Sequence, residues 1–326
     1  MEITRARVRE DMERGLPITV LMPVFNAEKY VAAATQSILS QSFTDFEFII
    51  LDDGSTDSSL EILTKFATSD ARIRLVSREN RGLVATLNEM IALASGRYLA
   101  RMDADDISHP GRFEAQVRYL ETHPNVAALG TRGLFIDPDG GPLAPFLDVL
   151  THDEIVAALL APALGIIHPA AMIRRDAMLE AGGYRPDCTH AEDLDLWLRL
   201  SETYQLHNLD RVLISYRVHA GSVSKTNHFE QWHMAGLIVD DTLRRRGLPP
   251  AAKRPPAPPL IGAIETRRMW AWWALGAGNL STARKHALHV LLREPLNTGS
   301  WRVASQVLRE SIFGRSRRRA GSTSET

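Results

Sequence analysis

Short runs of β-branched and aromatic residues alternate with stretches of helical apolar spacing over the first hundred residues. The runs fall at residues 18–22, 46–51, 73–77 and 97–102, and the helical stretches fall at 27–39, 56–66 and 83–94. Parallel strands need a crossover connection, usually a helix, so this order is typical of βαβ units. The pattern predicts an α/β fold with a mostly parallel central sheet that helices cover on both faces.

The pattern changes in the second half of the chain. Further strands are expected at 126–130, 133–136, 168–174 and 212–218, with a turn at 137–141 and a helix at 191–200. Beyond residue 229 the sequence becomes helical, with a Pro- and Arg-rich linker at 245–259, a helix hairpin at 269–292 and a basic tail at 315–319. We expect a main domain over residues 17–228 and a helical C-terminal extension over residues 229–326.

Composition excludes several classes of protein. Lys and Arg number 38 against 39 Asp and Glu, so the overall charge gives no reason to expect a nucleic-acid partner. The single cysteine, Cys188, excludes an intrachain disulfide and fits a reducing compartment. The longest uncharged apolar run, 155–167, is too short to cross a bilayer. The charged N-terminal segment does not resemble a signal peptide, so we expect a cytoplasmic protein.

Three carboxylates crowd into the stretch Asp103-Ala104-Asp105-Asp106, directly after the predicted strand at 97–102. Like charges at this spacing repel one another unless a positive group lies among them. The N-terminus of a following helix accounts for one or two such acids, but Ser108 is already a good cap. A divalent cation held by carboxylate and diphosphate oxygens would account for all three. Both interpretations stay open at this point.

Four other positions each have a structural and a functional interpretation. Asp53 follows a predicted strand, where it caps a helix or bonds a pyrimidine or ribose. Arg81 lies in a turn and could help to hold the charge of a nucleotide. Asp193 opens a predicted helix, either as an acid favoured by the helix dipole or as a general base. His219 ends a strand-like run, where it is a surface residue or a metal ligand.

Four stretches occur together in one order over about residues 17–224: "VLMPVFNAEKYVAAATQSILSQSFTDFEFIILDDGSTDSS", "NRGLVATLNEMIALASGRYLARMDADD", "AEDLDLWLRL" and "YRVHAGSVS". Together they resemble the inverting family 2 glycosyltransferases of the GT-A fold. The resemblance implies a nucleotide-diphospho-sugar transferase domain with a Rossmann-like central mixed sheet. It also implies that a divalent cation, Mn²⁺ or Mg²⁺, is the cofactor.

The resemblance further implies roles for individual residues on the donor side. Pro23, Phe25 and Asp53 match positions that contact the nucleoside base, and Arg81 lies in a segment that often does so. Asp103 matches the first acid of the DXD motif and would face the ribose or a metal-bound water.

The same resemblance implies the metal ligands and the catalytic base. Asp105 matches the last acid of the DXD motif and would ligate the metal, and His219 matches a histidine that often reaches the metal or the diphosphate. Asp193 matches the general base of the ED motif. In such a site the cation stabilises the charge that develops on the diphosphate, while the base deprotonates the acceptor hydroxyl on the opposite face.

Departures from the family and rival functions refine this hypothesis. Processive members carry Gln-x-x-Arg-Trp and membrane helices, whereas Gln231-Trp232 here lacks the arginine and the spacing, so we expect transfer of one sugar per encounter. A nucleotidyltransferase would need a glycine-rich basic loop, and residues 23–30 contain one lysine and no glycine. A non-catalytic nucleotide-sugar binding module is the other rival, against which the intact acids weigh.

The expected partners follow from the resemblance. The donor is a nucleotide-diphosphate sugar, with UDP as the favoured nucleotide, and the acceptor is a glycan or a lipid-linked glycan of surface polysaccharide synthesis. The C-terminal extension, with its tryptophans and basic tail, could make peripheral contact with the inner face of the membrane.

Overall fold

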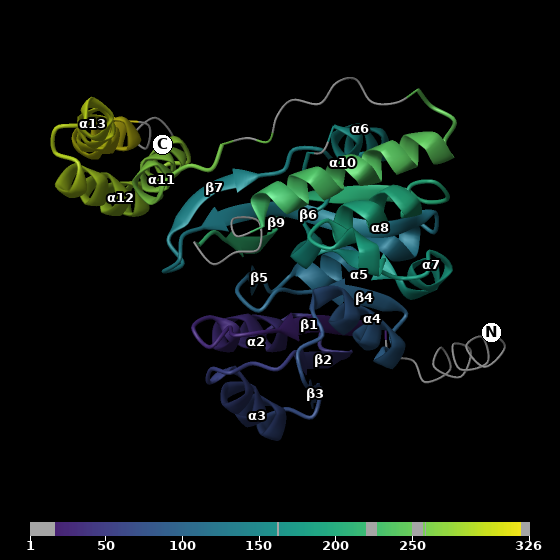
Figure 1. Cartoon of the computed structure of the whole chain (residues 1–326). Coiled ribbons are helices and arrows are strands. Elements are labelled where there is room, and N and C mark those ends of the chain that lie inside the picture. The colour runs from purple at the N-terminus through teal and green to yellow at the C-terminus, as the bar shows by residue number, and fades with distance from the viewer. Residues whose placement is uncertain (1–16, 162, 220–226, 250–256, 258, 321–326) are drawn as a thin grey trace. The chain divides into compact units, whose positions relative to one another are not determined.

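The computed structural model describes residues 17–161, 163–219, 227–249, 257 and 259–320 (Figure 1). These residues form two compact units, which are described separately below. The first unit combines segments up to residue 133 with segments 147–216 and 227–257. The second combines segment 134–146 with the described parts of 217–226 and 258–326. The predicted domain boundary at residue 229 stays a prediction.

The described residues form a mixed sheet of nine strands in the order β3-β2-β1-β4-β8-β6-β9-β5, with β7 paired to β6; all of these strands except β7 lie wholly or mainly in the first unit. The strands are β1 (Ile18–Val24), β2 (Phe46–Asp52), β3 (Ile73–Ser77), β4 (Tyr98–Arg101), β5 (Ile107–Ser108), β6 (Val126–Ile136), β7 (Pro142–Phe146), β8 (Met172–Arg174) and β9 (Gln205–Arg217). Strands β1 to β4 pair in parallel, whereas β8 pairs antiparallel to both β4 and β6. All seven residues of β1 are buried, which is why this strand is a continuous apolar run in the sequence.

Helices cover this sheet, as the alternating pattern predicted. They are α2 (Val31–Leu39), α3 (Ser59–Ser69), α4 (Leu83–Leu93), α5 (Arg112–Thr122), α6 (His152–Leu160), α7 (Arg175–Glu180), α8 (Glu192–Leu200) and α10 (His228–Arg245), with 3₁₀ turns η1 (His168–Ala170) and η2 (Pro186–Cys188). The apolar faces of α4, α8 and α10 join one core cluster, in which Trp197 is 1% exposed. None of the described helices has the length and apolar content needed to span a bilayer.

Three expected strand boundaries were wrong, and one of them is the start of β9, which begins at Gln205 and not at residue 212. The expected break between 130 and 133 does not occur, because β6 is continuous from Val126 to Ile136. Gly130 is needed there for a close approach, since a Cβ at this position would lie 2.1 Å from Oδ1 of Asn208. The expected strand at 168–174 begins instead with η1, because Pro169 cannot donate a ladder hydrogen bond, and only Met172–Arg174 pairs in the sheet.

The second unit packs three helices against the β6–β7 hairpin. These are α11 (Ala263–Gly276), α12 (Leu280–Arg293) and α13 (Thr298–Ala320), and the first two confirm the predicted helix hairpin. The predicted turn at 137–141 is also present, because Asp137 accepts the backbone N–H groups of Asp139 and Gly141 at 2.9 and 2.8 Å. The second Asp137 oxygen pairs with Lys285 and His286 of α12, so one buried carboxylate joins the turn to the helices.

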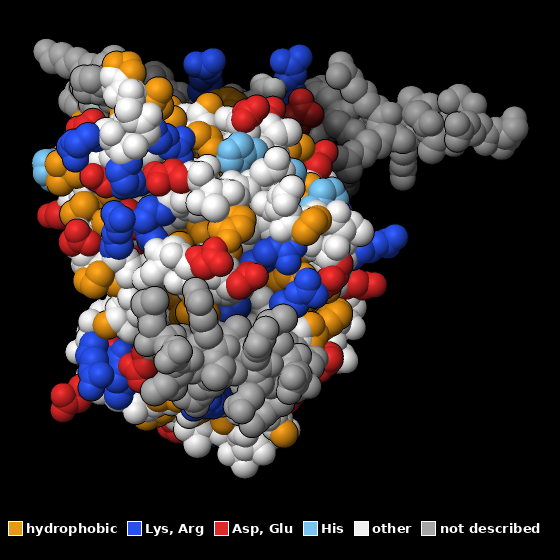
Figure 2. Space-filling model, turned by 90° about the vertical axis from the view of Figure 1, so that its right-hand side faces the viewer, with side chains coloured by type: hydrophobic (Ala, Val, Ile, Leu, Met, Phe, Trp, Pro, Cys, Tyr) orange, Lys and Arg blue, Asp and Glu red, His pale blue; other side chains and the backbone are white. Residues whose placement is uncertain are grey.

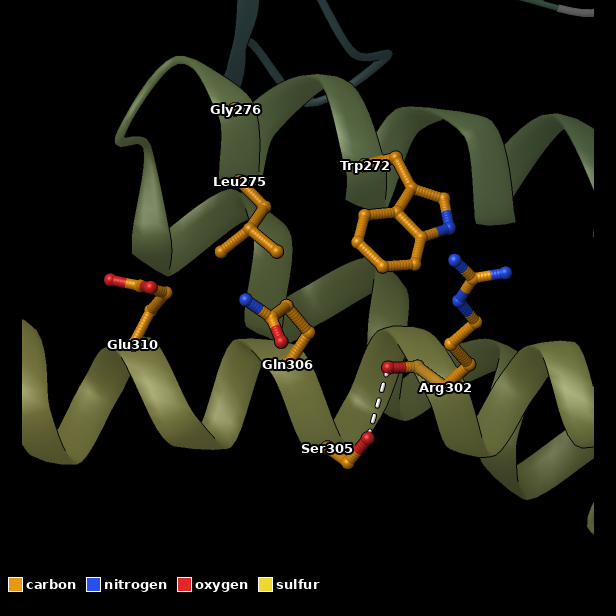
Figure 3. A pocket seen from close by; sticks show the side chains of 7 residues that line it. All are labelled: Trp272, Leu275, Gly276, Arg302, Ser305, Gln306 and Glu310. Atoms are coloured by element: carbon orange, nitrogen blue, oxygen red, sulfur yellow. Dashed lines mark hydrogen bonds between the residues drawn. The ribbon is translucent and has the colours of Figure 1, made fainter.

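Most of the predicted linker at 245–259 lies outside the described residues. An open groove of about 520 Å³ runs between α11 and α13 (Figure 3). Its lining residues are Trp272, Leu275, Gly276, Arg302, Ser305, Gln306 and Glu310. On the face that Figure 2 displays, acidic and basic side chains are interspersed among polar and apolar ones.

Candidate active site

Three parallel strands end at the same edge of the sheet, and the candidate residues follow these ends. The register pairs Val24 with Asp52, and Leu21 with Arg101. Backbone hydrogen bonds continue this alignment past the strands, because the N–H of Asp53 donates to the carbonyl of Val24 at 2.7 Å and that of Met102 to Leu21 at 3.0 Å. The carboxyl ends of parallel strands are the usual place for ligands in such sheets.

Asp53 directly follows β2 at this edge and is 4% exposed. Its two carboxylate oxygens accept the backbone N–H groups of Arg81 and Gly82 at 2.8 and 2.9 Å, directly before α4. Arg78, which the sequence did not indicate, forms an ion pair with the same carboxylate. Asp53 therefore connects the turn before α4 to the end of β2 through hydrogen bonds.

The other three residues predicted for the donor side differ in exposure. Pro23 is buried within β1, whereas the ring of Phe25, just beyond the strand, is 52% exposed. The side chain of Arg81 is exposed, and its backbone N–H holds Asp53. An exposed aromatic ring and an exposed cation beside a strand end can contact a base and a phosphate, respectively.

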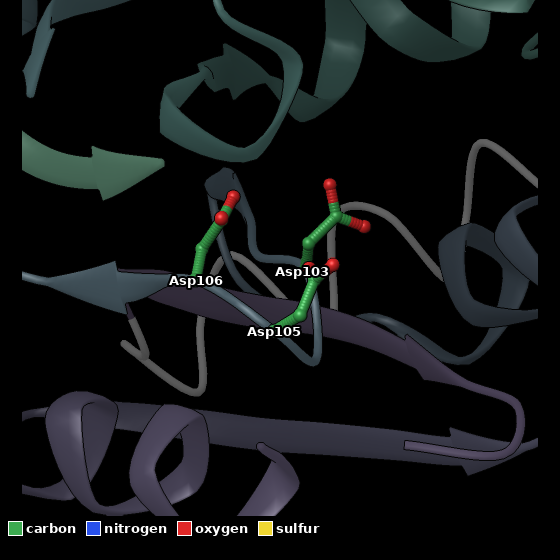
Figure 4. A group of neighbouring side chains, drawn as sticks. All are labelled: Asp103, Asp105 and Asp106. Atoms are coloured by element: carbon green, nitrogen blue, oxygen red, sulfur yellow. The ribbon is translucent and has the colours of Figure 1, made fainter. Parts of the chain in front are cut away.

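The acidic turn after β4 gathers three carboxylates. One oxygen from each of Asp103, Asp105 and Asp106 lies within 4.8 Å of the others (Figure 4). Hard divalent cations prefer oxygen ligands, and carboxylates at this spacing can share one ion. This donor set therefore fits Mg²⁺ or Mn²⁺.

A buried arginine lies behind the acidic turn. Arg101, the last residue of β4, is 3% exposed and forms an ion pair with Asp103. Burial raises the pKa of Asp103, Arg101 opposes this shift, and the charge of Asp105 adds to it. An additional cation at the turn would further stabilise the ionised forms of these carboxylates.

The N-terminus of α8 brings a second pair of acids to the same place. Burial, followed by the charge of Asp193, raises the pKa of Glu192 to about 7. Burial also raises the pKa of Asp193, with opposing contributions from the Leu194 N–H and Arg101 and a further raising contribution from Asp103. The charges of the acidic turn and of α8 are therefore close enough to influence one another.

The third acid of α8 has a structural role. Asp195 is 2% exposed and pairs with Arg199 at 2.7 Å and with Arg185 at 3.4 Å. Glu192 is also nearly buried, at 6% exposure, whereas Asp193 is partly exposed. Of the three acids, Asp193 is therefore the one with both solvent access and no arginine partner among the described ion pairs.

Two tyrosines complete the surroundings of these acids, and the sequence did not indicate either of them. Tyr184 is 2% exposed and hydrogen-bonds to Nε2 of His168 at 2.7 Å. Burial raises the pKa of Tyr184 and of Tyr216, and the acids of the turn and of α8 contribute in both cases. A neutral phenol beside several carboxylates can donate a hydrogen bond without adding negative charge.

His219 follows β9 and belongs to the second unit. Its predicted role as a metal ligand stays a prediction, as do the roles of the other site residues named from the resemblance.

The sheet is mixed and not mostly parallel as the strand–helix alternation predicted, because β8 pairs antiparallel to β4 and β6, and β5 to β9. An acidic turn at the carboxyl edge of its parallel part suits an enzyme that handles a phosphorylated ligand. The family model described as glycosyl transferase family 2 matches residues 19–181. The chain belongs to this family, and it is a glycosyltransferase.

Several relatives share most of the chain. EpsE of Bacillus subtilis (strain 168), described provisionally as a glycosyltransferase, is 35% identical over 259 residues, which cover 78% of this chain and 91% of EpsE. The O-antigen biosynthesis glycosyltransferase WbnJ of Escherichia coli is 32% identical over 233 residues, which cover 70% of this chain and 90% of WbnJ.

Solved structures agree on the fold. S. aureus TarS 1-349 in complex with UDP-GlcNAc superposes with a TM-score of 0.57 at 17% identity, covering 91% of this chain and 92% of that chain. The mannosyltransferase PcManGT from Pyrobaculum calidifontis, in complex with GDP-Man and Mn²⁺, gives a TM-score of 0.54 at 16% identity, covering 94% and 87%. The predicted GT-A fold with its mixed central sheet is confirmed.

Proposed function

We propose that this glycosyltransferase moves one sugar from a nucleotide-diphosphate sugar to a hydroxyl of a glycan or lipid-linked acceptor, with inversion and without processive addition. The observation that carries the proposal is the convergence of two acidic groups, one on the turn after β4 and one at the start of α8, around Arg101. Inverting transfer needs a charge-neutralising site for the diphosphate and a separate base for the acceptor.

The donor is a UDP-sugar in this proposal. TarS is solved with UDP and with UDP-GlcNAc, which supports uridine, and PcManGT with GDP-Man keeps guanosine as the alternative. Phe25 would stack on the base, and Pro23, Asp53 and Arg81 would border it. Asp53 already accepts three donors, so its contact with the base would use the remaining lone-pair capacity of its carboxylate.

Asp105 would hold Mn²⁺ or Mg²⁺, with His219 as a further ligand. The bound cation would neutralise charge on the departing diphosphate. Asp103 pairs with Arg101, so it would face the ribose or a metal-bound water. The close set of carboxylate oxygens supports a cation at this turn.

Asp193 would take the proton of the acceptor hydroxyl. Its raised pKa favours that role, because a base works best when its pKa approaches the working pH. Its partial exposure supports access to an acceptor, whereas burial keeps Glu192 away from one.

The proposed acceptor belongs to surface polysaccharide synthesis. The relative WbnJ is named as an O-antigen biosynthesis glycosyltransferase, and this supports a surface polysaccharide intermediate as the acceptor. We propose a cytoplasmic protein that meets such an acceptor at the inner face of the membrane.

The test is a product analysis with UDP- and GDP-sugars, Mn²⁺ and candidate acceptors. Release of UDP or GDP with a new glycosidic bond of inverted configuration is expected, and the Asp193→Asn variant should lose transfer by roughly two to four orders of magnitude while donor binding persists. Asp187→Asn is the matched control, because Asp187 is an exposed acid only six residues away. Retention of configuration, or transfer by Asp193→Asn at the rate of Asp187→Asn, would contradict the proposal.

A further inference from the structure

Exposed apolar side chains are concentrated in the second unit. Among the described residues, nine of the fourteen large hydrophobic side chains that are exposed lie between residues 260 and 312. Scattered exposed apolar residues are ordinary, but a contiguous group marks a surface that contacts something other than water.

Six of these residues belong to α12, to α13 or to the short connection between these two helices, which Figure 1 shows as neighbours. We call them the α12–α13 apolar face, and each is between 56 and 96% exposed: Leu288, Leu292, Leu296, Trp301, Leu308 and Ile312. The buried contacts of α13 lie elsewhere on the helix, at Val303 and Val307. The apolar face is therefore not part of the core of this unit.

Two hydrogen bonds fix how the helices align. Arg284 donates from Nε to Oγ of Ser311 at 2.8 Å, and Nε1 of Trp301 donates to the carbonyl of Pro295 at 2.7 Å. The start of α12 thus lies beside the later part of α13, and the end of α12 lies beside Trp301. Residues four apart share a face of a helix, so Leu288 follows Arg284 on the side of α12 that borders Leu308.

The same segment is strongly basic. Residues 280–320 contain nine Lys and Arg against two Asp and Glu, a formal charge of +7 in a chain whose total is −1. Four of these arginines, at positions 315, 317, 318 and 319, fall in the last turns of α13. Beside the apolar face, the groove of Figure 3 adds the indole of Trp272 close to Arg302.

We propose that the α12–α13 apolar face and its arginines bind an anionic lipid bilayer, with α12 and α13 lying in the plane of the interface. Leucine and isoleucine enter the acyl boundary in such a geometry, tryptophan lies at headgroup level, and arginine attracts lipid phosphates. This surface goes beyond the transfer reaction and does not depend on it.

Charge favours the bilayer over a second copy of the chain. A dimer through this face would bring two segments of +7 together, and like charges across an interface oppose association. An anionic bilayer complements both the arginines and the apolar side chains.

The test is co-sedimentation of the full chain with vesicles of phosphatidylcholine alone and with vesicles that also contain phosphatidylglycerol. The wild type should bind the second kind and release at high salt. The double variant Leu308→Gln, Ile312→Gln should lower the partition coefficient about tenfold or more, and Arg318→Gln about fivefold. Leu237→Gln, which changes a side chain of α10 that is 49% exposed, is the matched control and should bind as the wild type does.

Three results would overturn the proposal. The first is equal binding of the wild type to both kinds of vesicle, and the second is wild-type partition of both the double variant and Arg318→Gln. The third is a dimer in light scattering that the double variant converts to a monomer, without vesicle binding by the wild type, because the face would then be a subunit interface. Thermal melting of each variant checks that these surface changes leave the fold intact.

Discussion

Asp53 offers a test of how the edge of the sheet is built. Its carboxylate accepts two backbone N–H groups and pairs with the guanidinium of Arg78, which is itself 11% exposed. In the Asp53→Asn variant, one oxygen still accepts a hydrogen bond, but the amide NH₂ faces a donor that it cannot satisfy. Arg78 keeps only its second acidic partner, Glu89, at 2.8 Å.

The expected loss follows from these contacts. A hydrogen bond to a charged group contributes about 1.5–3 kcal/mol, and the variant loses one such bond together with part of the Arg78 pairing. The free energy of unfolding should fall by about 2–4 kcal/mol, which lowers the melting temperature by roughly 5–15 °C for a domain of this size. Urea and thermal unfolding measure both quantities.

A matched control and a second readout make the result decisive. Glu61→Gln is the same chemical change in an ion pair with Lys65 whose side chains are 71 and 72% exposed, so it should leave stability unchanged. A free energy of unfolding for Asp53→Asn within about 0.5 kcal/mol of the wild type would refute the account. If UDP affinity alone fell, Asp53 would contact the base and would not hold the turn before α4.

Three further changes separate the other buried groups. Asp195→Asn should lower the free energy of unfolding by about 3 kcal/mol, because Arg199 loses its acidic partner. Activity per folded molecule should persist. Loss of activity at wild-type stability would contradict this structural role. Because burial and then Asp193 raise the pKa of Glu192 from 4.5 to about 7, the native state binds more protons in this window and wild-type stability falls as the pH rises through it. Glu192→Gln removes this dependence. In urea unfolding, the free energy of unfolding of the variant relative to the wild type should therefore rise by about 2–3 kcal/mol between pH 5 and pH 8. A difference between the two proteins that stays constant over this pH range would refute the assignment. Burial raises the pKa of Cys188 to about 12, so mass spectrometry should find this thiol unmodified by iodoacetamide at pH 8 until urea unfolds the chain, whereas rapid native labelling would contradict its burial.

Local periodicity was enough to predict the parallel half of the sheet. The strand at 73–77 agrees with β3 at both ends, and β1, β2 and β4 differ by two residues or fewer at each end. β1, β2 and β4 are almost entirely buried, so their apolar runs are easy to recognise. The break expected after Gly130 was wrong because a glycine that permits close packing looks the same in sequence as one that permits a turn.

The acids of the candidate site were visible as patterns, but their partners were not. Arg101 looked like any charged residue at the end of a strand, Tyr184 lies outside the four quoted stretches, and Tyr216 opens the last of them without an assigned role. Arg101 pairs with Asp103 two residues away, but its influence on Glu192, and those of Tyr184 and Tyr216 on the acids, depend on tertiary contacts that span many residues of sequence. Asp195 is different, because its partner Arg199 is four residues away on α8, a spacing that places both side chains on one face of the helix.

The central claim is that the acidic turn binds the donor diphosphate through a divalent cation, and isothermal titration of UDP tests it most directly. The wild type should bind UDP about tenfold more tightly, or better, with Mn²⁺ than with EDTA, because a charged partner contributes about 1–3 kcal/mol. Asp105→Asn should lose most of this difference, while Asp187→Asn, the same change at an exposed acid, keeps it. Equal UDP affinity of the wild type in Mn²⁺ and in EDTA would contradict the account.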